Sequence, residues 1–442
     1  MAAVALGLTG CTTGSEKANL SNSIRQDPAL SEPISPQAAS ADLKAWITWL
    51  TQTHPDLAYT TDLAVLEETA QSVNDELAKA ETLRDAWSSM ARLNPVFDDA
   101  HTGLRLPQSH FDAWIESGGF AFPADVTVHN RMLYLAASGE EIAAINQEAP
   151  AEFLDWILTR IRGEDASIRE RVISLKFPLA YWTFAGGAEE YHLKLKTSEG
   201  VSRELNLTAP SLPDDEETAD EEFALTILGN TAVLRIDTFE IGRAEEFASF
   251  LQLGFARIAE SKSQRLVIDL RSNGGGAREL SNSLMEYLTH KTFSAFSAVT
   301  ARITAENQRL VSGSSIGEVV RIPFTQPVKP KEELQDRFEG DVWILVGPDT
   351  YSQAIAFAAT SQDEKVARIA GLPTSGRANQ TGQVQMHRLR NTGFNVQSPI
   401  YIFTRKSGHV SSAPLMPDLI LENSEDAPIT DILEQLTFVG TR

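Results

Sequence analysis

The chain has 442 residues, of which 42% are hydrophobic and 22% are charged, a composition typical of a folded protein with a core. Its formal net charge of -22 argues against binding to nucleic acid or to an anionic membrane surface by charge alone. No apolar run reaches the roughly 18 residues that a spanning helix needs, and the length suits about two to four domains.

The first 40 residues contain the single cysteine of the chain, Cys11. It follows a short run of small apolar residues, and the letters LTGC at 8–11 resemble a bacterial lipobox. That resemblance implies cleavage before Cys11, a lipid on its sulfur, and export. The polar stretch that follows to residue 40 is predicted to be a flexible tether. Because no Lys or Arg precedes the apolar run, a disordered N-terminus with an incidental cysteine is the alternative.

Residues 41–108 are predicted to form a small helical domain. Just after its helices, the letters DDAHTG place His101 among acidic residues on a turn. A nearby carboxylate such as Asp99 can orient a histidine ring or favour its charged form, whereas a surface turn rich in Asp and Gly is the alternative. Apolar residues recur at helical spacing along the domain at Leu43, Trp46, Ile47, Leu50, Leu66, Ala70, Val73, Leu77, Leu83, Trp87, Met90 and Leu93.

Residues 109–212 are predicted to form a mixed α/β domain. Alternating patterns indicate strands within 125–135 and 191–207, and a helical pattern covers 151–161. The letters GEEIAAIN at 139–146 resemble the strand and turn of PDZ domains. The carboxylate-binding loop of PDZ domains is not evident, so a degenerate PDZ-like part is predicted, as a scaffold remnant rather than a peptide-binding domain, and the sequence does not give whether it binds peptide. The letters PDDEETADEE at 213–222 predict an acidic linker.

From residue 223 to 442 strands and helices alternate, which indicates an α/β domain. A buried strand at 266–270 runs into the letters RSNGGG, where Asn273 precedes Gly274, Gly275 and Gly276. Such a triplet lets backbone N–H groups face a ligand. The letters match neither a Gly-Lys-Ser/Thr loop nor G-x-G-x-x-G, which argues against a nucleotide. An oxyanion-hole loop and a plain connection remain, although a connection normally needs one glycine.

A second apolar strand, 342–346, leads through a turn at 347–349 to a helical run at 354–359. Ser352 lies at the junction. A serine raised there from the end of a sheet, with neighbouring N–H groups facing the same point, has the geometry of a nucleophile beside an oxyanion hole. The alternative is an ordinary N-cap serine.

Several stretches together resemble the C-terminal-processing and tricorn-type serine peptidases. The letters RLVIDLRSNGGG at 265–276 resemble the I-D-L-R-x-N-x-G-G signature of that family, and 342–359 resembles its nucleophile segment. Residues 369–377 resemble its following I-x-G-x-x-T-x-G loop, and Pro-Asp at 417–418 resembles a pair near the end of its catalytic domain. The letters DAHT at 99–102 resemble the Asp-Gly-His-Thr of the Ser-His branch.

The resemblance implies a crotonase-like (ClpP-like) catalytic domain of β-β-α units, preceded by the helical and PDZ-like parts. It implies Ser352 as nucleophile, with the N–H groups of Gly275 and Gln353 as oxyanion donors and Gly274, Gly276 and Asn273 as the supporting loop. It also implies His101 as general base. The Ser-Lys branch has a lysine where this chain has Arg377, and arginine stays protonated.

Two departures from the family affect the site. The tricorn-type triad has a Glu near the late Pro-Asp, and this chain has Val410-Ser411-Ser412 there. Asp99 is therefore predicted to orient His101, with a Ser-His dyad as the alternative. The family often has Ala and Glu shortly after the nucleophile, where this chain has Gln353 and Ile355.

The sequence therefore predicts a serine endopeptidase that acts on peptides or unfolded proteins in the bacterial cell envelope, without a metal or cofactor. The lipobox resemblance implies that this protein is attached to a membrane only through a lipid on Cys11. An inactive binding protein on the same fold and a hydrolase of small acyl esters are the alternatives. Arg377 or Arg405 is predicted to hold a substrate carboxylate. The sequence does not give the oligomeric state.

Overall fold

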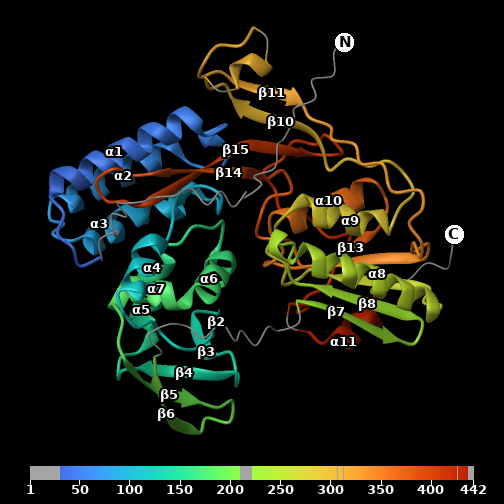
Figure 1. The fold of residues 1–442 in the computed structure, drawn as a ribbon, viewed down its shortest axis with the longest axis horizontal. Coiled ribbons are helices and arrows are strands. Elements are labelled where there is room, and N and C mark those ends of the chain that lie inside the picture. The colour runs from blue at the N-terminus through green and yellow to red at the C-terminus, as the bar shows by residue number, and fades with distance from the viewer. Residues whose placement is uncertain (1–29, 210–221, 306, 312, 426, 437–442) are drawn as a thin grey trace, which may run out of the picture.

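The computed structural model describes residues 30–436 apart from 210–221, 306, 312 and 426. The predicted lipobox at Cys11 lies outside the described residues, and so does the predicted acidic linker apart from Glu222. The described part is a mixed α and β protein built from several layers, as the sequence predicted (Figure 1). No helix within it is long and apolar enough to cross a membrane.

The N-terminal part is helical, as its apolar periodicity predicted. Its first helix begins at Pro36, earlier than the expected start at residue 41. The reason is local: the Ser35 hydroxyl caps the helix by accepting a hydrogen bond from the Ala38 N–H at 3.2 Å, and proline suits the first helical position. The elements are α1 (Pro36–Thr53), η1 (Leu57–Tyr59), α2 (Leu63–Leu77), α3 (Leu83–Met90) and η2 (Ala91–Phe97).

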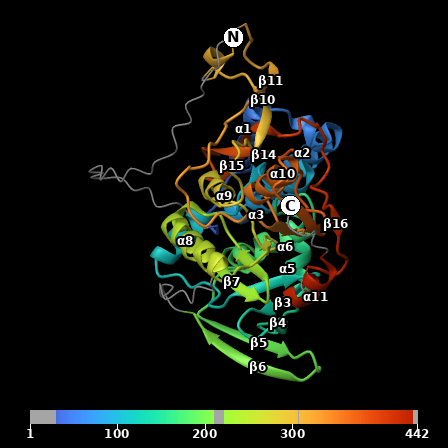
Figure 2. The same ribbon diagram turned by 90° about the vertical axis from the view of Figure 1, so that its right-hand side faces the viewer.

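The middle part is an antiparallel sheet of order β2-β3-β4-β5-β6 with helices packed against it. The predicted strands within 125–135 and 191–207 are confirmed as two hairpins, and the β5–β6 hairpin projects at one end of the molecule (Figure 2). Neither α6 nor α7 was predicted. α7 is apolar on almost every side, so its apolar residues show no clear period. The elements are α4 (Gln108–Glu116), β2 (Val126–His129), β3 (Met132–Leu135), β4 (Glu140–Ile145), α5 (Pro150–Leu158), α6 (Ala166–Leu175), α7 (Phe177–Ala185), β5 (Glu190–Lys196) and β6 (Ser202–Thr208).

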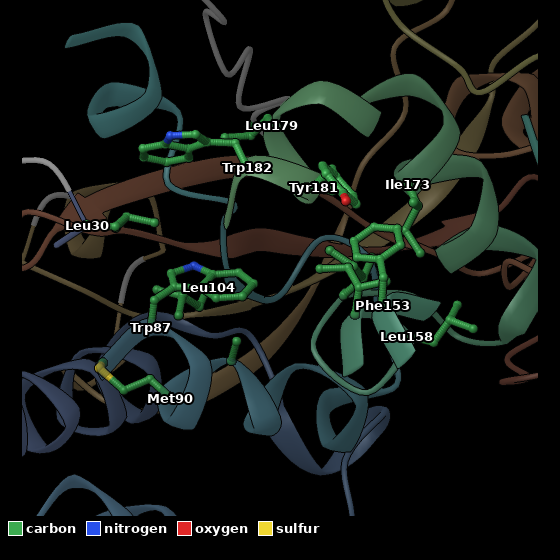
Figure 3. Packing of buried hydrophobic residues seen from close by; sticks show 14 of the residues in the cluster. Leu30, Trp87, Met90, Leu104, Phe153, Leu158, Ile173, Leu179, Tyr181 and Trp182 are labelled. Carbon is green, nitrogen blue, oxygen red and sulfur yellow. The ribbon is translucent and has the colours of Figure 1, made fainter. Parts of the chain in front are cut away.

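One hydrophobic cluster spans the N-terminal helices and the middle part. Trp87 from α3 and Phe153 from α5 are both buried in it, together with Trp182 from α7 (Figure 3). Phe394 and Val396 from the C-terminal region also belong to this cluster. Replacing a fully buried aromatic such as Trp87 by alanine would cost about 3–5 kcal/mol.

The C-terminal part contains a sheet of order β16-β13-β12-β9-β8-β7, parallel except for the β7–β8 pair. Its central strands are buried on both faces, which explains their unbroken apolar letters. In β9, Ile268 joins the cluster with α8, α9 and α10, whereas Val267 joins the cluster with α11. The elements are β7 (Phe223–Leu228), β8 (Thr231–Ile236), η3 (Ile241–Arg243), α8 (Ala244–Glu260), β9 (Arg265–Asp269), α9 (Arg278–Glu286), β12 (Asp341–Val346), α10 (Gln353–Asp363), β13 (Arg368–Gly371), β16 (Leu419–Ile420) and α11 (Ile429–Gln435).

A third sheet joins the end of the N-terminal helical part, through β1, to strands of the C-terminal part. Gly103 in β1 pairs with Gln397 in β15, so the turn that carries His101 is attached to the C-terminal region. Gly103 (φ 135°) is needed there, because a side chain would collide with Asn94 Oδ1. The elements are β1 (Gly103–Leu104), β10 (Phe296–Arg302), η4 (Gln308–Leu310), β11 (Val319–Pro323), β14 (Thr381–Arg388) and β15 (Asn395–Arg405).

Candidate active site

Ser352 has a backbone conformation that an ordinary N-cap serine does not adopt. Its φ and ψ are 48° and -117°, a region in which residues other than glycine are rare and strained. Its side chain makes no capping hydrogen bond to α10. Ser35, by contrast, has φ -77° and ψ 144° and does cap its helix. The hydroxyl of Ser352 therefore does not cap the helix that it precedes, and its strained backbone resembles that of a strand-to-helix nucleophile turn.

The turn before Ser352 is tied to the glycine loop by hydrogen bonds. Thr350 Oγ1 accepts from the Gly347 N–H at 3.0 Å and donates to the Leu270 carbonyl at 2.8 Å. The Tyr351 N–H donates to the carbonyl of Asn273 at 2.9 Å. These bonds fix the ends of β9 and β12 side by side, so the two sequence motifs meet at one edge of the sheet.

The glycine loop lies against Ser352. A side chain on Gly275 (φ 100°) would bring its Cβ within 2.7 Å of the Ser352 Cβ and 2.8 Å of the Gln353 nitrogen. The Gly275 N–H, a predicted oxyanion donor, instead donates to Asn273 Oδ1 at 2.8 Å. Gln353 is the first residue of α10, where N–H groups lack intrahelical partners. Gly276 lines the same cavity as Ser352 and Gln353.

The other loop glycine, Gly274, leaves room for the middle part of the chain. A Cβ at this position would lie 2.9 Å from Arg171 Nη2, a side chain of α6. The predicted supporting role of Asn273 has a clear structural basis, because its amide Nδ2 donates to the Ile236 carbonyl at 2.9 Å. The glycine loop is thus hydrogen-bonded to the end of β8 through Asn273 and packs against Arg171 of α6 through Gly274.

His101 is oriented by Asp99 and by Thr381. Thr381 Oγ1 donates to Asp99 Oδ1 at 2.8 Å, because an ionised carboxylate can only accept. The 3.1 Å contact between Thr381 Oγ1 and His101 Nδ1 therefore requires the proton on Nδ1. The same Nδ1 lies 3.5 Å from Asp99 Oδ1. In neutral His101 this tautomer leaves Nε2 as a proton acceptor.

Asp99 is almost fully buried and remains ionised. Burial alone would raise its pKa. Hydrogen bonds from His101 and Thr102, together with the charge of His101, outweigh burial and hold the pKa of Asp99 well below its ordinary value. Thr102 Oγ1 donates to Asp99 Oδ2 at 2.7 Å and is itself 3.2 Å from His54 Nε2. Burial lowers the pKa of His54 to about 4, so this second histidine is neutral at pH 7.

Tyr351 packs against His101, and Glu164 is hydrogen-bonded to Tyr351. The rings of Tyr351 and His101 stack with centroids 5.3 Å apart, and the Tyr351 hydroxyl donates to Glu164 Oε1 at 2.7 Å. Burial, followed by the charge of Asp99, raises the pKa of Glu164 to about 7. Glu164 comes from the loop between α5 and α6, so the middle part of the chain contributes directly to the site.

The role of Arg377 or Arg405 in holding a substrate carboxylate stays a prediction, and both arginines are paired with acidic side chains of the protein itself. Arg377 donates to the side chain of Asp98 at 2.5 Å and to its carbonyl at 2.7 Å. Arg405 forms a two-bond pair with Asp363, at 3.0 and 2.7 Å. Because Asp98 precedes Asp99 on the turn, Arg377 fixes the segment that carries His101.

A cavity of about 730 Å³ opens beside Ser352. Gln380 Nε2 donates to the Ser352 carbonyl at 2.9 Å and so fixes its backbone from the cavity side. Ile355, which replaces the family's glutamate, is buried in the core and its methyl group packs near Gly376. The lining residues are Gly276, Arg278, Glu279, Asn282, Ser294, Ala295, Phe296, Gln326, Pro327, Val328, Ser352, Gln353, Gln380, Thr381, Gly382, Gln383 and Phe403.

Sequence reasoning missed Thr381, Tyr351 and Glu164. Tyr351 could have been noticed because it precedes the nucleophile, but Thr381 and Glu164 carry no local signal and reach the site only through the fold. Among the residues that the structure describes, no group of three or more His, Cys, Asp or Glu side chains is arranged to hold a metal ion.

The site combines a serine on a strained strand-to-helix turn with a glycine loop packed against it. A histidine oriented by an aspartate stacks on Tyr351, the residue before the serine. Serine peptidases use groups of these kinds. Comparison with known proteins agrees with this class: residues 230–421 match the model of Peptidase family S41. The matched region is in the C-terminal part of the chain, and it resembles the family that the motifs at 265–276 and 342–359 predicted.

The tail-specific protease of Haemophilus influenzae is 24% identical to this chain over 202 residues, which are 46% of this chain and 25% of that protein. The chain therefore matches about a quarter of the length of this relative. Mature CPAF complexed with lactacystin has a TM-score of 0.60 and 16% identity, covering 87% of this chain and 94% of that chain. Another structure of mature CPAF has a TM-score of 0.59 and 15% identity, covering 87% and 93%. These likenesses establish the fold.

Proposed function

We propose that this protein is a serine endopeptidase in which Ser352 is the nucleophile and His101 the general base. The backbone of Ser352 carries the proposal. Strain of this kind costs about 1–3 kcal/mol and persists where the surroundings enforce it, typically at functional sites. An ordinary helix cap would avoid that cost.

The reaction follows from the proton positions. His101 Nε2 takes the proton of the Ser352 hydroxyl while the oxygen attacks a peptide carbonyl carbon. The resulting oxyanion is held by the Gln353 N–H and by the glycine loop, and one such donor is typically worth about 3 kcal/mol. His101 then protonates the departing amine, which leaves an acyl group on Ser352. Water, deprotonated by the same nitrogen, releases the acid and restores the serine.

The Gly275 N–H takes part in this scheme only if it leaves or shares its bond to Asn273. We propose that substrate binding draws this N–H toward the oxyanion, with Gly276 as the neighbouring donor on the same loop. The fixed donor is Gln353 at the start of α10, where the helix dipole also favours negative charge.

Asp99 is the proposed third member of the triad. It holds His101 in the Nδ1–H tautomer, both directly at 3.5 Å and through Thr381. It also stabilises the imidazolium that forms when His101 takes the proton. In this proposal Asp99 has the role of the glutamate that the tricorn-type triad has near the late Pro-Asp, where this chain has Val410-Ser411-Ser412.

We also propose a domain organisation and an attachment to the membrane for this enzyme. The β7–β8–α8 unit and the strand-helix units after it are consistent with a crotonase-like catalytic domain, and β2–β6 with a degenerate PDZ-like part. We also propose that Cys11 carries a lipid that anchors an exported enzyme, whose substrates are peptides or unfolded proteins.

Hydrolysis of an unfolded protein tests this function directly. Reduced, carboxymethylated casein should be cleaved by the wild type and not by Ser352→Ala, with peptides identified by mass spectrometry. A nitrophenyl ester, measured in parallel, distinguishes the small-ester hydrolase: ester cleavage without any casein cleavage would refute the endopeptidase. Loss of neither activity in Ser352→Ala would refute the nucleophile.

A further inference from the structure

Arg278 lines the same cavity as Ser352. It is the first residue of α9, and its side chain is partly buried. Within the described part of the chain, its guanidinium forms no ion pair. Partly removing a cation from water without giving it an anion is unfavourable, so an anion that enters the cavity would gain from pairing with it.

Three other arginines in this part of the fold differ from Arg278, because each is paired with an acidic side chain. Arg377 is paired with Asp98, Arg405 with Asp363, and Arg271 with Asp269 at 2.7 Å. Burial lowers the pKa of Arg278, but a guanidinium still carries its charge at neutral pH. The charge of the neighbouring Glu279 acts in the opposite direction to burial, but Glu279 is exposed to solvent and forms no ion pair with Arg278 in the described part of the chain. Arg278 therefore lines the cavity as a positive charge that is only partly offset.

The backbone of Arg278 is fixed relative to the nucleophile. Gln353 follows Ser352 in the chain, and its side-chain Nε2 donates to Ser281 Oγ at 2.8 Å. Ser281 Oγ donates in turn to the Arg278 carbonyl at 3.0 Å. The preceding residue, Ala277, donates through its N–H to the Phe239 carbonyl at 2.6 Å. The backbone that carries the Arg278 side chain is therefore held at a fixed position relative to Ser352.

The rest of the lining selects the kind of anion. Apart from Arg278, the charged lining residue is Glu279, whose side chain is exposed to solvent, and the others are neutral polar or apolar groups such as Gln383 and Phe403. One planar guanidinium among neutral groups matches a single carboxylate, which it can bind through two parallel hydrogen bonds.

We propose that Arg278 is a specificity residue that binds a carboxylate of the substrate close to the scissile bond. The carboxylate is that of an acidic side chain or of the peptide's free C-terminus. This inference rests on the proposed peptidase function and adds to it a substrate class: peptides with an acidic group beside the cleavage site.

A peptide library tests the inference. Synthetic peptides of random sequence, each made with a free and with an amidated C-terminus, would be digested and the cleavage sites read by mass spectrometry. Matched pairs that differ by Glu against Gln at the selected position would then give kcat and KM separately. The variants are Arg278→Gln, Arg278→Lys and Arg278→Glu, with Glu279→Gln inside the cavity and Arg257→Gln on the exposed face of α8 as controls.

The wild type should favour an acidic residue or a free C-terminus. Arg278→Gln should raise KM for the acidic peptide at least tenfold and change the Gln peptide by less than twofold. Arg278→Lys should retain part of the preference, Arg278→Glu should favour basic peptides, and Glu279→Gln should improve the acidic ones. Loss of preference with amidated peptides alone would identify the C-terminal carboxylate as the bound group.

The inference and the proposed function fail in different ways. If the wild type and Arg278→Gln cleave acidic and neutral peptides with the same ratio, the inference is wrong and the peptidase stands. If the wild type cleaves no peptide, the proposed function is wrong and the inference falls with it. Thermal unfolding of each variant shows whether it is folded, and Arg278→Lys decides the matter if Arg278→Gln is not.

Discussion

The variant Glu164→Gln should stabilise the protein at pH 8. Glu164 is 9% exposed, accepts the Tyr351 hydroxyl at 2.7 Å and lies 3.8 Å from Arg377. Burial raises its pKa to about 7 from an ordinary value of 4.5. Glutamine keeps the size of the side chain and its hydrogen-bond acceptor, and it removes the charge that the folded state disfavours.

The sign and size follow from linkage. Between pH 4.5 and 7 the unfolded chain releases the Glu164 proton while the folded protein keeps it, so stability falls as pH rises. The shift of about 2.5 units, at 1.36 kcal/mol per unit, gives about 3 kcal/mol lost by pH 7, after which the loss is constant. The hydrogen bond from Tyr351 and the charge of His101, which lower the pKa of Glu164, are already included in that shift. Glu164→Gln should thus exceed the wild type by on the order of 2–3 kcal/mol at pH 8 and by almost nothing at pH 4.5.

Urea unfolding of the wild type and Glu164→Gln at several values between pH 5 and 8 measures this difference. The control is Glu68→Gln on the exposed face of α2, which should show no such trend. A gap between Glu164→Gln and the wild type that stays constant with pH, or a less stable variant at pH 8, would refute the argument from burial.

Three further predictions concern the catalytic groups. Ser352→Gly should abolish hydrolysis and yet raise the free energy of unfolding by about 1 kcal/mol, because glycine accepts φ 48° without strain; urea unfolding that shows a loss of stability would count against strain at this position. Asp99→Asn should lower kcat by about 10³–10⁴-fold with a small change in KM, since it leaves His101 in the wrong tautomer, and steady-state kinetics that show a change in KM alone would exclude this role. Thr381→Val should lower kcat and Thr381→Ser should restore most of it, whereas equal rates for the two variants would show that the hydroxyl bridge between Asp99 and His101 has no function.

The fold could be predicted from sequence where local patterns report burial directly. The strands at 266–270 and 342–346 are apolar because both of their faces are covered, and α9, the helix after the first of them, has apolar residues at helical spacing. α7 and the β10–β11 hairpin were missed for opposite reasons. α7 is apolar nearly all round, so it has no contrast between faces, and β11 is a partly exposed strand without an apolar run.

Part of the candidate site could likewise be predicted from sequence motifs, and part of it is formed only by the fold. Ser352 and the glycine loop are close in the fold because parallel strands end at the same edge of a sheet, which letters alone can suggest. Thr381 and Glu164 join His101 only through long-range packing, and no motif marks them. The pairing of Arg377 with Asp98 was also invisible in sequence, because 279 residues separate the two.

Labelling with a fluorophosphonate probe, which reacts with activated serines, tests the central claim most directly. We expect the wild type to be labelled, and Ser352→Ala and His101→Ala to be unlabelled under the same conditions although both remain folded. Absence of label on the folded wild type would contradict the account and favour a binding protein on a peptidase fold. Label that persists in Ser352→Ala would place the nucleophile elsewhere.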